Sequence, residues 1–331
     1  MNTESARDII QDLMPSFPLK HCRRLVKDTT DFTGISYGDV IELESRHFLV
    51  LRDEAERRFG MEDPKFWVKR CRVLETGSRA ILKLVFHEKF NQQIGPVVIN
   101  CYRSPEKESR ILDLVRGDGR FMQGETVRDE AGNPVRIIEV INGKSLDNIV
   151  EDLDMGHEQY FHEEFPEILQ KFLQTCQAIG YLHNHGEKHG DIRRDHIFVE
   201  RGTRAYRWID FDYAYESVEN PFGLDVFGLG GILLFAAGKG VHESQALAGT
   251  DQGGAVLAKT TPDDFSLLFP NRLVNLKTLF PYIPESLNRV LMHFSRGTCV
   301  AYETVPEMLE DLEHASQDVA GLKAQNQKKP A

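Results

Sequence analysis

The stretch Tyr181–Val199 reads YLHNHGEKHGDIRRDHIFV, and the segment WIDFD follows at Trp208–Asp212. Apolar residues recur at three- and four-residue spacing from Phe165 to Leu182, which predicts one long buried helix. A polar loop and two short apolar runs come next, so the pattern predicts helix, loop, strand and second strand. Asp191 and Asp210 are therefore expected at the tips of neighbouring strands.

These two carboxylates stand 19 residues apart and are of the type that phosphoryl transfer uses. That chemistry needs one carboxylate to orient the attacking hydroxyl and further ligands to hold Mg²⁺ on the phosphates. Two other interpretations stay open: ordinary surface loops, and a two-metal hydrolase. The hydrolase would draw on six side chains of ligand type, namely His189, Asp191, Asp195, His196, Asp210 and Asp212.

The rest of the chain divides into a strand-rich part and a helical part. We interpret residues 1–35 as an N-terminal extension with a short amphipathic helix, and short β-forming runs follow as far as residue 103. A helix capped by Ser104 and two more strands complete a small lobe over 36–141. Residues 142–315 are mainly helical, and the polar tail at 316–331 is expected to be disordered. The fold class is therefore α+β.

Composition excludes several function classes. The 331 residues carry a formal net charge of -11, which disfavours nucleic acid and anionic membranes as partners. Five scattered cysteines suggest neither a disulfide framework nor a zinc site and fit a reducing cytoplasm. The N-terminus has no signal-peptide pattern, and the apolar stretch Gly230–Gly238 is too short to span a membrane.

The motifs named above resemble those of the protein-kinase-like superfamily. His189-Gly190-Asp191 is similar to its catalytic loop, Asp210-Phe211-Asp212 to its metal-binding motif, and Asp225–Gly230 to the following helix, whose Asp braces the catalytic loop. The resemblance covers roughly residues 45–315. It implies a bilobal fold with a small β-rich N-lobe and a larger helical C-lobe.

The N-terminal half carries matching signals. Lys83 resembles the strand lysine that contacts the ATP phosphates, and Glu108 the helix glutamate that pairs with it. Glu106 competes with Glu108 for that role. The backbone from Glu139 to Ile141 resembles the hinge that binds the adenine edge.

The resemblance also assigns roles in the C-terminal half. Asp191 would orient the acceptor hydroxyl, and Arg193 would neutralise the moving phosphoryl group. His196 and Asp210 would hold Mg²⁺, or Mn²⁺ because one ligand is a nitrogen. The implied cofactors are ATP and the metal, and the implied activity is an ATP:hydroxyl phosphotransferase.

Several positions depart from the family pattern. One glycine, Gly60, stands where a Gly-rich phosphate loop is expected, with Arg57 and Arg58 nearby. His196 replaces Asn, as in some lipopolysaccharide kinases, and Asp212 replaces Gly, as acidic residues do in choline and aminoglycoside kinases.

The acceptor and the activity therefore stay open. Only fifteen residues lead from Asp210 to Asp225, which is short for a peptide-docking segment. Closing helices similar to those of bacterial protein kinases make protein Ser/Thr the default acceptor. The alternatives are a small-molecule or lipopolysaccharide-type sugar kinase, and a pseudokinase that binds nucleotide or a partner. The sequence does not reveal the activator or the oligomeric state.

Overall fold

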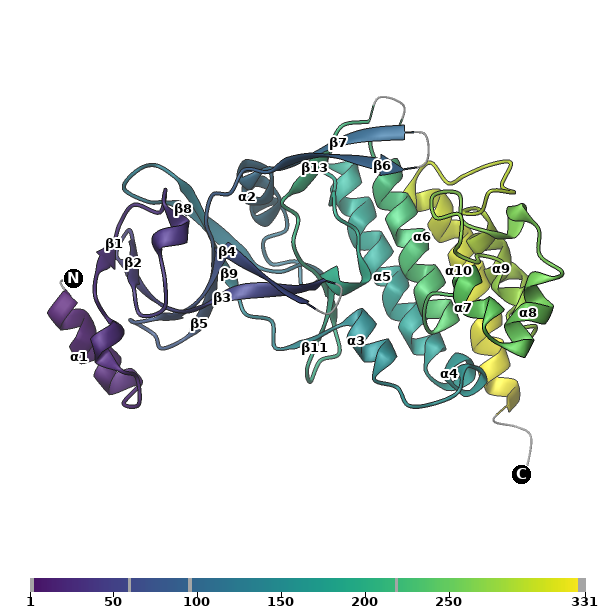
Figure 1. The fold of residues 1–331 in the computed structure, drawn as a ribbon, viewed down its shortest axis with the longest axis horizontal. Coiled ribbons are helices and arrows are strands. Elements are labelled where there is room, and N and C mark those ends of the chain that lie inside the picture. The colour runs from purple at the N-terminus through teal and green to yellow at the C-terminus, as the bar shows by residue number, and fades with distance from the viewer. Residues whose placement is uncertain (1–2, 59–60, 95–96, 218–219, 327–331) are drawn as a thin grey trace. The chain divides into compact units, whose positions relative to one another are not determined.

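The computed structural model describes residues 3–58, 61–94, 97–217 and 220–326 (Figure 1). The chain divides into two compact units. The first comprises Met1–Glu88 and Arg103–Ile141, and the second comprises Lys89–Tyr102 and Asn142–Ala331. The first is rich in strands and the second in helices, so the expected α+β class is confirmed.

A seven-stranded sheet forms the centre of the first unit. All neighbouring strands are antiparallel except the first pair, which is parallel. The strand order is β1 (Leu25–Val26), β2 (Val40–Leu43), β3 (Arg46–Arg58), β4 (Met61–Val73), β5 (Arg79–Lys83), β9 (Pro134–Glu139) and β8 (Gly124–Arg128). The turn at Thr76–Ser78 joins β4 to β5, and Gly77 supplies the left-handed φ of 69° that it needs.

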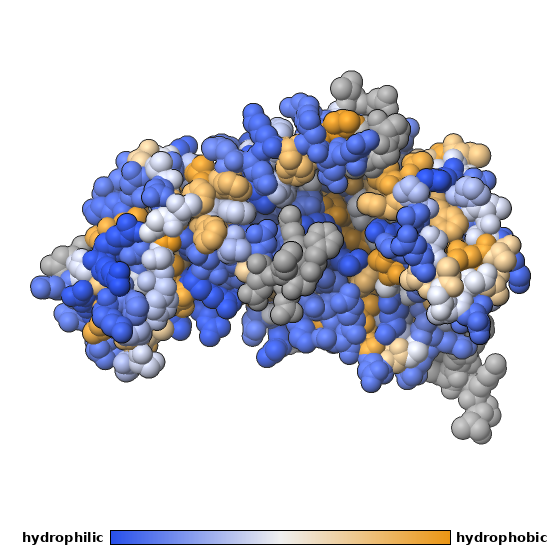
Figure 2. All heavy atoms as spheres, in the orientation of Figure 1, coloured by the Kyte–Doolittle hydropathy of each residue, from blue (hydrophilic) through white to orange (hydrophobic). Residues whose placement is uncertain are grey.

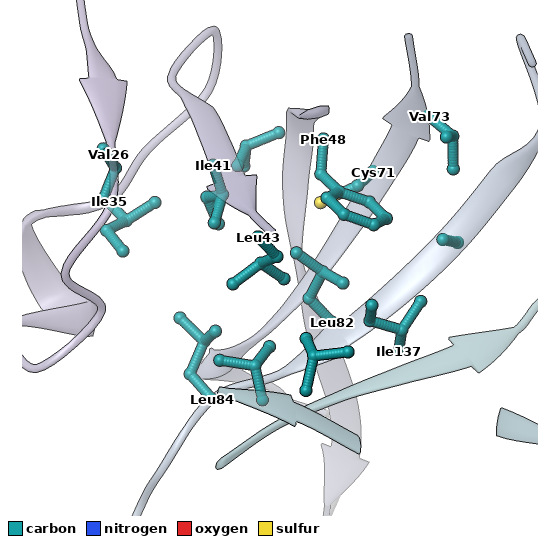
Figure 3. Packing of buried hydrophobic residues seen from close by; sticks show 14 residues of the cluster. Val26, Ile35, Ile41, Leu43, Phe48, Cys71, Val73, Leu82, Leu84 and Ile137 are labelled. Atoms are coloured by element: carbon teal, nitrogen blue, oxygen red, sulfur yellow. The ribbon is translucent and has the colours of Figure 1, made fainter. Parts of the chain in front are cut away.

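Apolar side chains from several strands meet on one face of this sheet (Figure 3). Phe48 and Leu82 come from β3 and β5, and both are fully buried. Val26 and Ile35 join the same cluster from the stretch that we interpreted as an N-terminal extension. Part of residues 1–35 therefore packs into the core of this unit, although their boundary with the lobe stays a prediction.

Helices α1 and α2 accompany the sheet. Helix α1 (Thr3–Leu13) buries Ala6 and Ile10. Helix α2 (Pro105–Leu114) begins as expected, because the Ser104 side chain accepts a hydrogen bond from the Lys107 amide. Short 3-10 turns cover Leu19–His21 and Phe32–Gly34.

The second unit is built on helices. Helices α5, α6 and α10 are the longest, and α5 packs against both of the others (Figure 1). The bounds are α3 (Leu146–Glu151), α4 (His157–Glu163), α5 (Phe165–Asn184), α6 (Gly223–Gly238), α7 (Ser244–Ala248), α8 (Asp251–Leu257), α9 (Glu285–Met292) and α10 (Val305–Asn326). Further 3-10 turns cover Arg194–His196, Pro262–Asp264 and Leu276–Thr278.

Two three-stranded sheets complete the second unit. One joins β10 (Gly143–Ser145), β11 (Ile197–Glu200) and β12 (Tyr206–Trp208). The other has the order β13-β7-β6, with β6 (Lys89–Ile94), β7 (Val97–Arg103) and β13 (Tyr213–Tyr215). Most of the β6–β7 hairpin thus belongs to this unit, although the sequence placed it in the small lobe.

The expectation of a disordered C-terminal tail is wrong for residues 316–326. We expected disorder from residue 316, but α10 continues to Asn326. Val319 is 1% exposed and extends the buried stripe that contains Val305, Met308 and Leu312. Burial of that stripe stabilises the extra turns. Residues 327–331 lie outside the described part of the chain.

Hydrophilic side chains cover most of the face shown in Figure 2, with hydrophobic atoms in scattered patches. Within the described ranges, every helix is too short or too polar to cross a lipid bilayer.

Candidate functional site

The loop that follows α5 is held by one buried carboxylate. Asp225, in the first turn of α6, accepts hydrogen bonds from the amides of His189 (2.7 Å) and Gly190 (3.0 Å). The Nε2 atom of His183 lies 3.1 Å from the same carboxylate. Burial raises the pKa of Asp225, but the His183 hydrogen bond and the charges of His189 and His183 outweigh it and hold that pKa below its usual range. The expected brace on the loop is thus confirmed.

Gly190 adopts a backbone conformation that favours glycine. Its φ is 88°, a left-handed conformation that a side chain disfavours. That conformation lets two consecutive amides point at the same carboxylate.

His196 lies between the two candidate catalytic carboxylates. Its Nδ1 is 2.9 Å from the Asp191 backbone carbonyl and 3.6 Å from Asp191 Oδ2, while its Nε2 is 3.6 Å from Asp210 Oδ2. A carbonyl only accepts hydrogen bonds, so Nδ1 must carry the hydrogen. In the neutral ring this leaves a lone pair on Nε2, which faces Asp210.

Asp210 adopts an unusual backbone conformation. Its φ is 69°, which few residues other than glycine adopt. The amide of Ile209 donates to the His196 carbonyl at 3.0 Å, and Phe211 is fully buried. Neighbours on both sides therefore hold Asp210 in this conformation, a form of local strain that is typical of functional sites.

The environment of Asp191 raises the pKa of its carboxyl group. Burial raises its pKa, and the negative charges of Asp210 and Asp212 act in the same direction. The charges of His196 and Arg193 oppose that rise only in part. A carboxyl with a raised pKa holds a proton more readily than an exposed one, as suits a group that interacts with a hydroxyl.

Arg193 forms a fork with a neighbouring residue. Its Nε lies 3.0 Å from Asp195 Oδ1 and one Nη lies 2.6 Å from Oδ2. Its role toward a phosphoryl group stays a prediction.

A second group of charges lies within the first unit. The Nζ atom of Lys83 is 2.7 Å from Glu108 Oε1, and the two side chains are 8% and 0% exposed. The expected pair is confirmed, and Glu106 is excluded because it lies exposed on the surface of α2.

The same carboxylate has a second partner that the sequence did not reveal. Arg136 Nε lies 3.1 Å from Glu108 Oε2, and its side chain is 1% exposed. Arg136 also donates to the carbonyls of Pro134 (2.9 Å) and Leu84 (3.2 Å). The only sequence signal was an arginine inside the apolar run of β9, opposite Lys83 in the strand register.

The expected hinge and phosphate-loop residues lie near the ends of β9 and β3. Glu139 ends β9 and donates its amide to the Gln123 carbonyl at 3.0 Å, and Ile141 is the last residue of the first unit. Arg57 and Arg58 lie at the end of β3, and Gly60 is outside the described residues. Adenine binding by the backbone from Glu139 to Ile141 stays a prediction.

Within 3–58, 61–94, 97–217 and 220–326, no group of three or more His, Cys, Asp or Glu side chains is placed to hold a metal ion. Asp210 and His196 form a pair of ligand atoms. Two ligands at about 2.1 Å from one Mg²⁺ can be at most roughly 4.2 Å apart, so their 3.6 Å separation fits a shared cation.

Comparison with solved structures identifies the type of fold. No family model and no curated protein matches the sequence. Among solved structures, the kinase domain of Mycobacterium tuberculosis PknI superposes with a TM-score of 0.50 at 11% identity, covering 86% of this chain and 99% of that one. The chain therefore has a protein-kinase-like fold.

Proposed function

We propose that this protein is an ATP-dependent phosphotransferase that moves the γ-phosphate of ATP to a hydroxyl group. The observation that supports this best is the position of His196 between Asp191 and Asp210. One ring nitrogen of His196 lies near Asp191, the carboxylate proposed to orient the acceptor. The other faces Asp210, with which it would share the metal ion. The phosphates of ATP would supply the oxygen ligands that Mg²⁺ or Mn²⁺ still needs.

Each residue then has one role. Asp191 orients the acceptor hydroxyl, while Asp210 and His196 hold the cation. Lys83, kept in place by Glu108, contacts the α- and β-phosphates. Arg193 neutralises the moving phosphoryl group, and the backbone from Glu139 to Ile141 binds adenine.

The default acceptor is a protein Ser or Thr, with a small molecule or a lipopolysaccharide-type sugar as the alternative. A second function is a pseudokinase that binds nucleotide without turnover. The single glycine in the expected phosphate loop favours the pseudokinase. The buried Lys83–Glu108 pair and the Asp191–His196–Asp210 arrangement favour an enzyme.

Binding is tested first by melting the protein with and without ATP and Mg²⁺ or Mn²⁺. A ligand that binds the folded state raises the melting temperature. No shift at millimolar nucleotide contradicts both the enzyme and the pseudokinase.

Turnover is tested with labelled ATP and cell extract, following label into protein and small-molecule fractions. The Asp191→Asn variant should lose transfer and keep nucleotide binding, because Asp191 acts on the acceptor. Binding without any transfer supports the pseudokinase, and full transfer by Asp191→Asn contradicts the role of Asp191.

A further inference from the structure

Two arginines of the second unit lie with their guanidinium groups over aromatic rings. The Arg194 guanidinium carbon is 4.5 Å from the centroid of Phe235, and that of Arg272 is 4.3 Å from the centroid of Phe269. Stacking on a ring holds the planar group in place and replaces part of its water. Both side chains are half-buried.

The backbone brings the two arginines to the same end of α6. Phe235, under Arg194, lies in the last turn of α6. The backbone of Arg272 pairs with that of Glu243 in an isolated antiparallel β-bridge, and Glu243 lies a few residues beyond that helix end. The amide of Leu273 donates to the His242 carbonyl at 2.9 Å, which attaches the Arg272 segment directly after α6.

Neither guanidinium has a hydrogen bond or an ion pair among the residues that the structure describes. The nearest acid in sequence to Arg194 is Asp195, whose carboxylate is occupied by Arg193. The Nε atom of Arg272 is buried without a hydrogen-bond partner. A buried polar atom of this kind is costly unless a ligand or water satisfies it.

The charges that act on Arg272 also indicate that the two arginines lie near each other. Burial lowers the pKa of Arg272, Glu243 opposes that effect, and the positive charge of Arg194 lowers the pKa further. The two like charges are therefore close enough to repel each other. The chain has a formal net charge of -11, yet neither arginine forms an ion pair within its described residues, although the charge of Glu243 acts on Arg272.

We propose that Arg194 and Arg272 bind an oxyanion, a phosphate or carboxylate group carried by the acceptor molecule. Guanidinium forks match both groups, and an anion would remove the repulsion between the two arginines. Arg194 belongs to the same loop as Asp191, three residues further on. The assignment of the anion to the acceptor rests on the proposed function, whereas anion binding itself does not.

The test compares melting temperatures in inorganic phosphate, in succinate and in chloride at equal ionic strength and pH. It uses Arg194→Gln and Arg272→Gln, each in a Lys83→Met background that removes the lysine expected to bind phosphates. Arg201→Gln is the matched control, because Arg201 is an exposed arginine of the same unit. We expect phosphate to stabilise the parent and the Arg201 control equally, and each Gln variant to need at least about tenfold more phosphate.

Equal phosphate responses in all four proteins would overturn the anion site. A response to phosphate alone indicates a phosphate group, and an equal response to succinate indicates a carboxylate. If the Gln variants do not fold, Arg194→Lys and Arg272→Lys keep the charge without the fork. Those variants should bind phosphate several-fold more weakly, and wild-type affinity in both would contradict the proposal.

The proposed function fails separately from the anion site. A protein that ignores ATP with Mg²⁺ but binds phosphate through the two arginines lacks the proposed function and keeps the site. In an active protein, Arg194→Gln should raise the KM for the acceptor several-fold with the KM for ATP unchanged. A change confined to the ATP KM would show that the anion does not belong to the acceptor.

Discussion

At the scale of single residues, His196 has the most informative geometry. One ring nitrogen donates to the Asp191 carbonyl, and the other faces Asp210. The hydrogen bond on Nδ1 orients the ring and decides which nitrogen offers a lone pair. His196 is thus placed where the proposed function needs a metal ligand.

Replacing His196 should change the metal requirement. We expect His196→Ala to raise the Mg²⁺ or Mn²⁺ concentration for half-maximal activity, or for metal-dependent nucleotide binding, by roughly 10–100-fold. His196→Asn supplies an oxygen ligand and should remain close to wild type with Mg²⁺. The exposed His185→Ala is the control. Unchanged metal dependence in His196→Ala would exclude His196 as a ligand.

Asp225 should be important for stability as well as for the loop. Asp225→Ala leaves the amides of His189 and Gly190 buried without their acceptor, so we expect a loss of roughly 2–5 kcal/mol in the free energy of unfolding. Urea denaturation measures it. Asp154→Ala removes an exposed carboxylate of the same unit and should change little.

The Asp225 contribution should depend on pH. Because its folded-state pKa is lowered, the stabilisation is present above the unfolded pKa of about 4 and is lost as pH falls through the folded value. The difference in stability between wild type and Asp225→Asn should therefore shrink below about pH 4. A difference that grows on acidification would contradict the assigned charge state.

At the scale of elements, α2 is attached to the sheet by one carboxylate with two cations. Glu108 lies on α2, Lys83 on β5 and Arg136 on β9, and all three side chains are buried. Lys83 contacts one oxygen of the Glu108 carboxylate and Arg136 contacts the other, so both cations hold the glutamate in place. Helix α2 is thereby fixed against the sheet within this unit.

The contacts among Lys83, Glu108 and Arg136 predict that two variants lose different amounts of unfolding free energy. Glu108→Ala leaves two buried cations without their anion and should cost roughly 3–5 kcal/mol of unfolding free energy. Lys83→Met should cost clearly less, because Arg136 still neutralises Glu108, yet it should weaken ATP binding. Glu106→Gln, on the exposed face of α2, is the control. Equal destabilisation by the two variants would contradict the role of Arg136.

The C-terminal half of α10 should contribute to folding. Val319 is buried, so Val319→Ala should lower the unfolding free energy by roughly 1–3 kcal/mol. The neighbouring Gln317→Ala removes an exposed side chain and should be neutral in the same denaturation experiment. A neutral Val319→Ala would support the original expectation of a disordered tail.

At the scale of the whole molecule, residues 213–216, which follow Asp210, are held by strand pairing. Strand β13 joins the sheet of the β6–β7 hairpin, and the Glu216 amide donates to the Asn100 carbonyl at 3.2 Å. The Phe90 and Tyr213 rings meet edge to face with centroids 5.6 Å apart. Backbone pairing therefore orders these residues, as a phosphate paired with arginine orders the loops of proteins that are activated by phosphorylation.

This ordering predicts activity without prior phosphorylation. Gly190 has no side chain to pair with a phosphate, and β13 is held by its neighbour strand. Phosphatase-treated protein should therefore transfer phosphate as fast as untreated protein in the labelled-ATP assay. Mass spectrometry checks that the treatment was complete, and a large loss of rate would contradict the prediction.

The sequence by itself determined the order of the elements and the residues that stand at motif spacing. Lys83, Asp191, Asp210 and Asp225 were recognisable because each depends on its local neighbours: a strand, a loop or a helix start. These local patterns also explain how a protein-kinase-like fold could be expected although the identity to PknI is 11%.

Only the tertiary structure decided which side chains share a partner. Glu108 and Arg136 are 28 residues apart, and Arg194 and Arg272 come together at the end of α6 through segments distant in sequence. The ring orientation of His196 and the left-handed backbone of Asp210 likewise depend on packing around them. Periodicity and motifs record local preferences, whereas hydrogen bonds and charge pairs between distant segments exist only after the chain has folded.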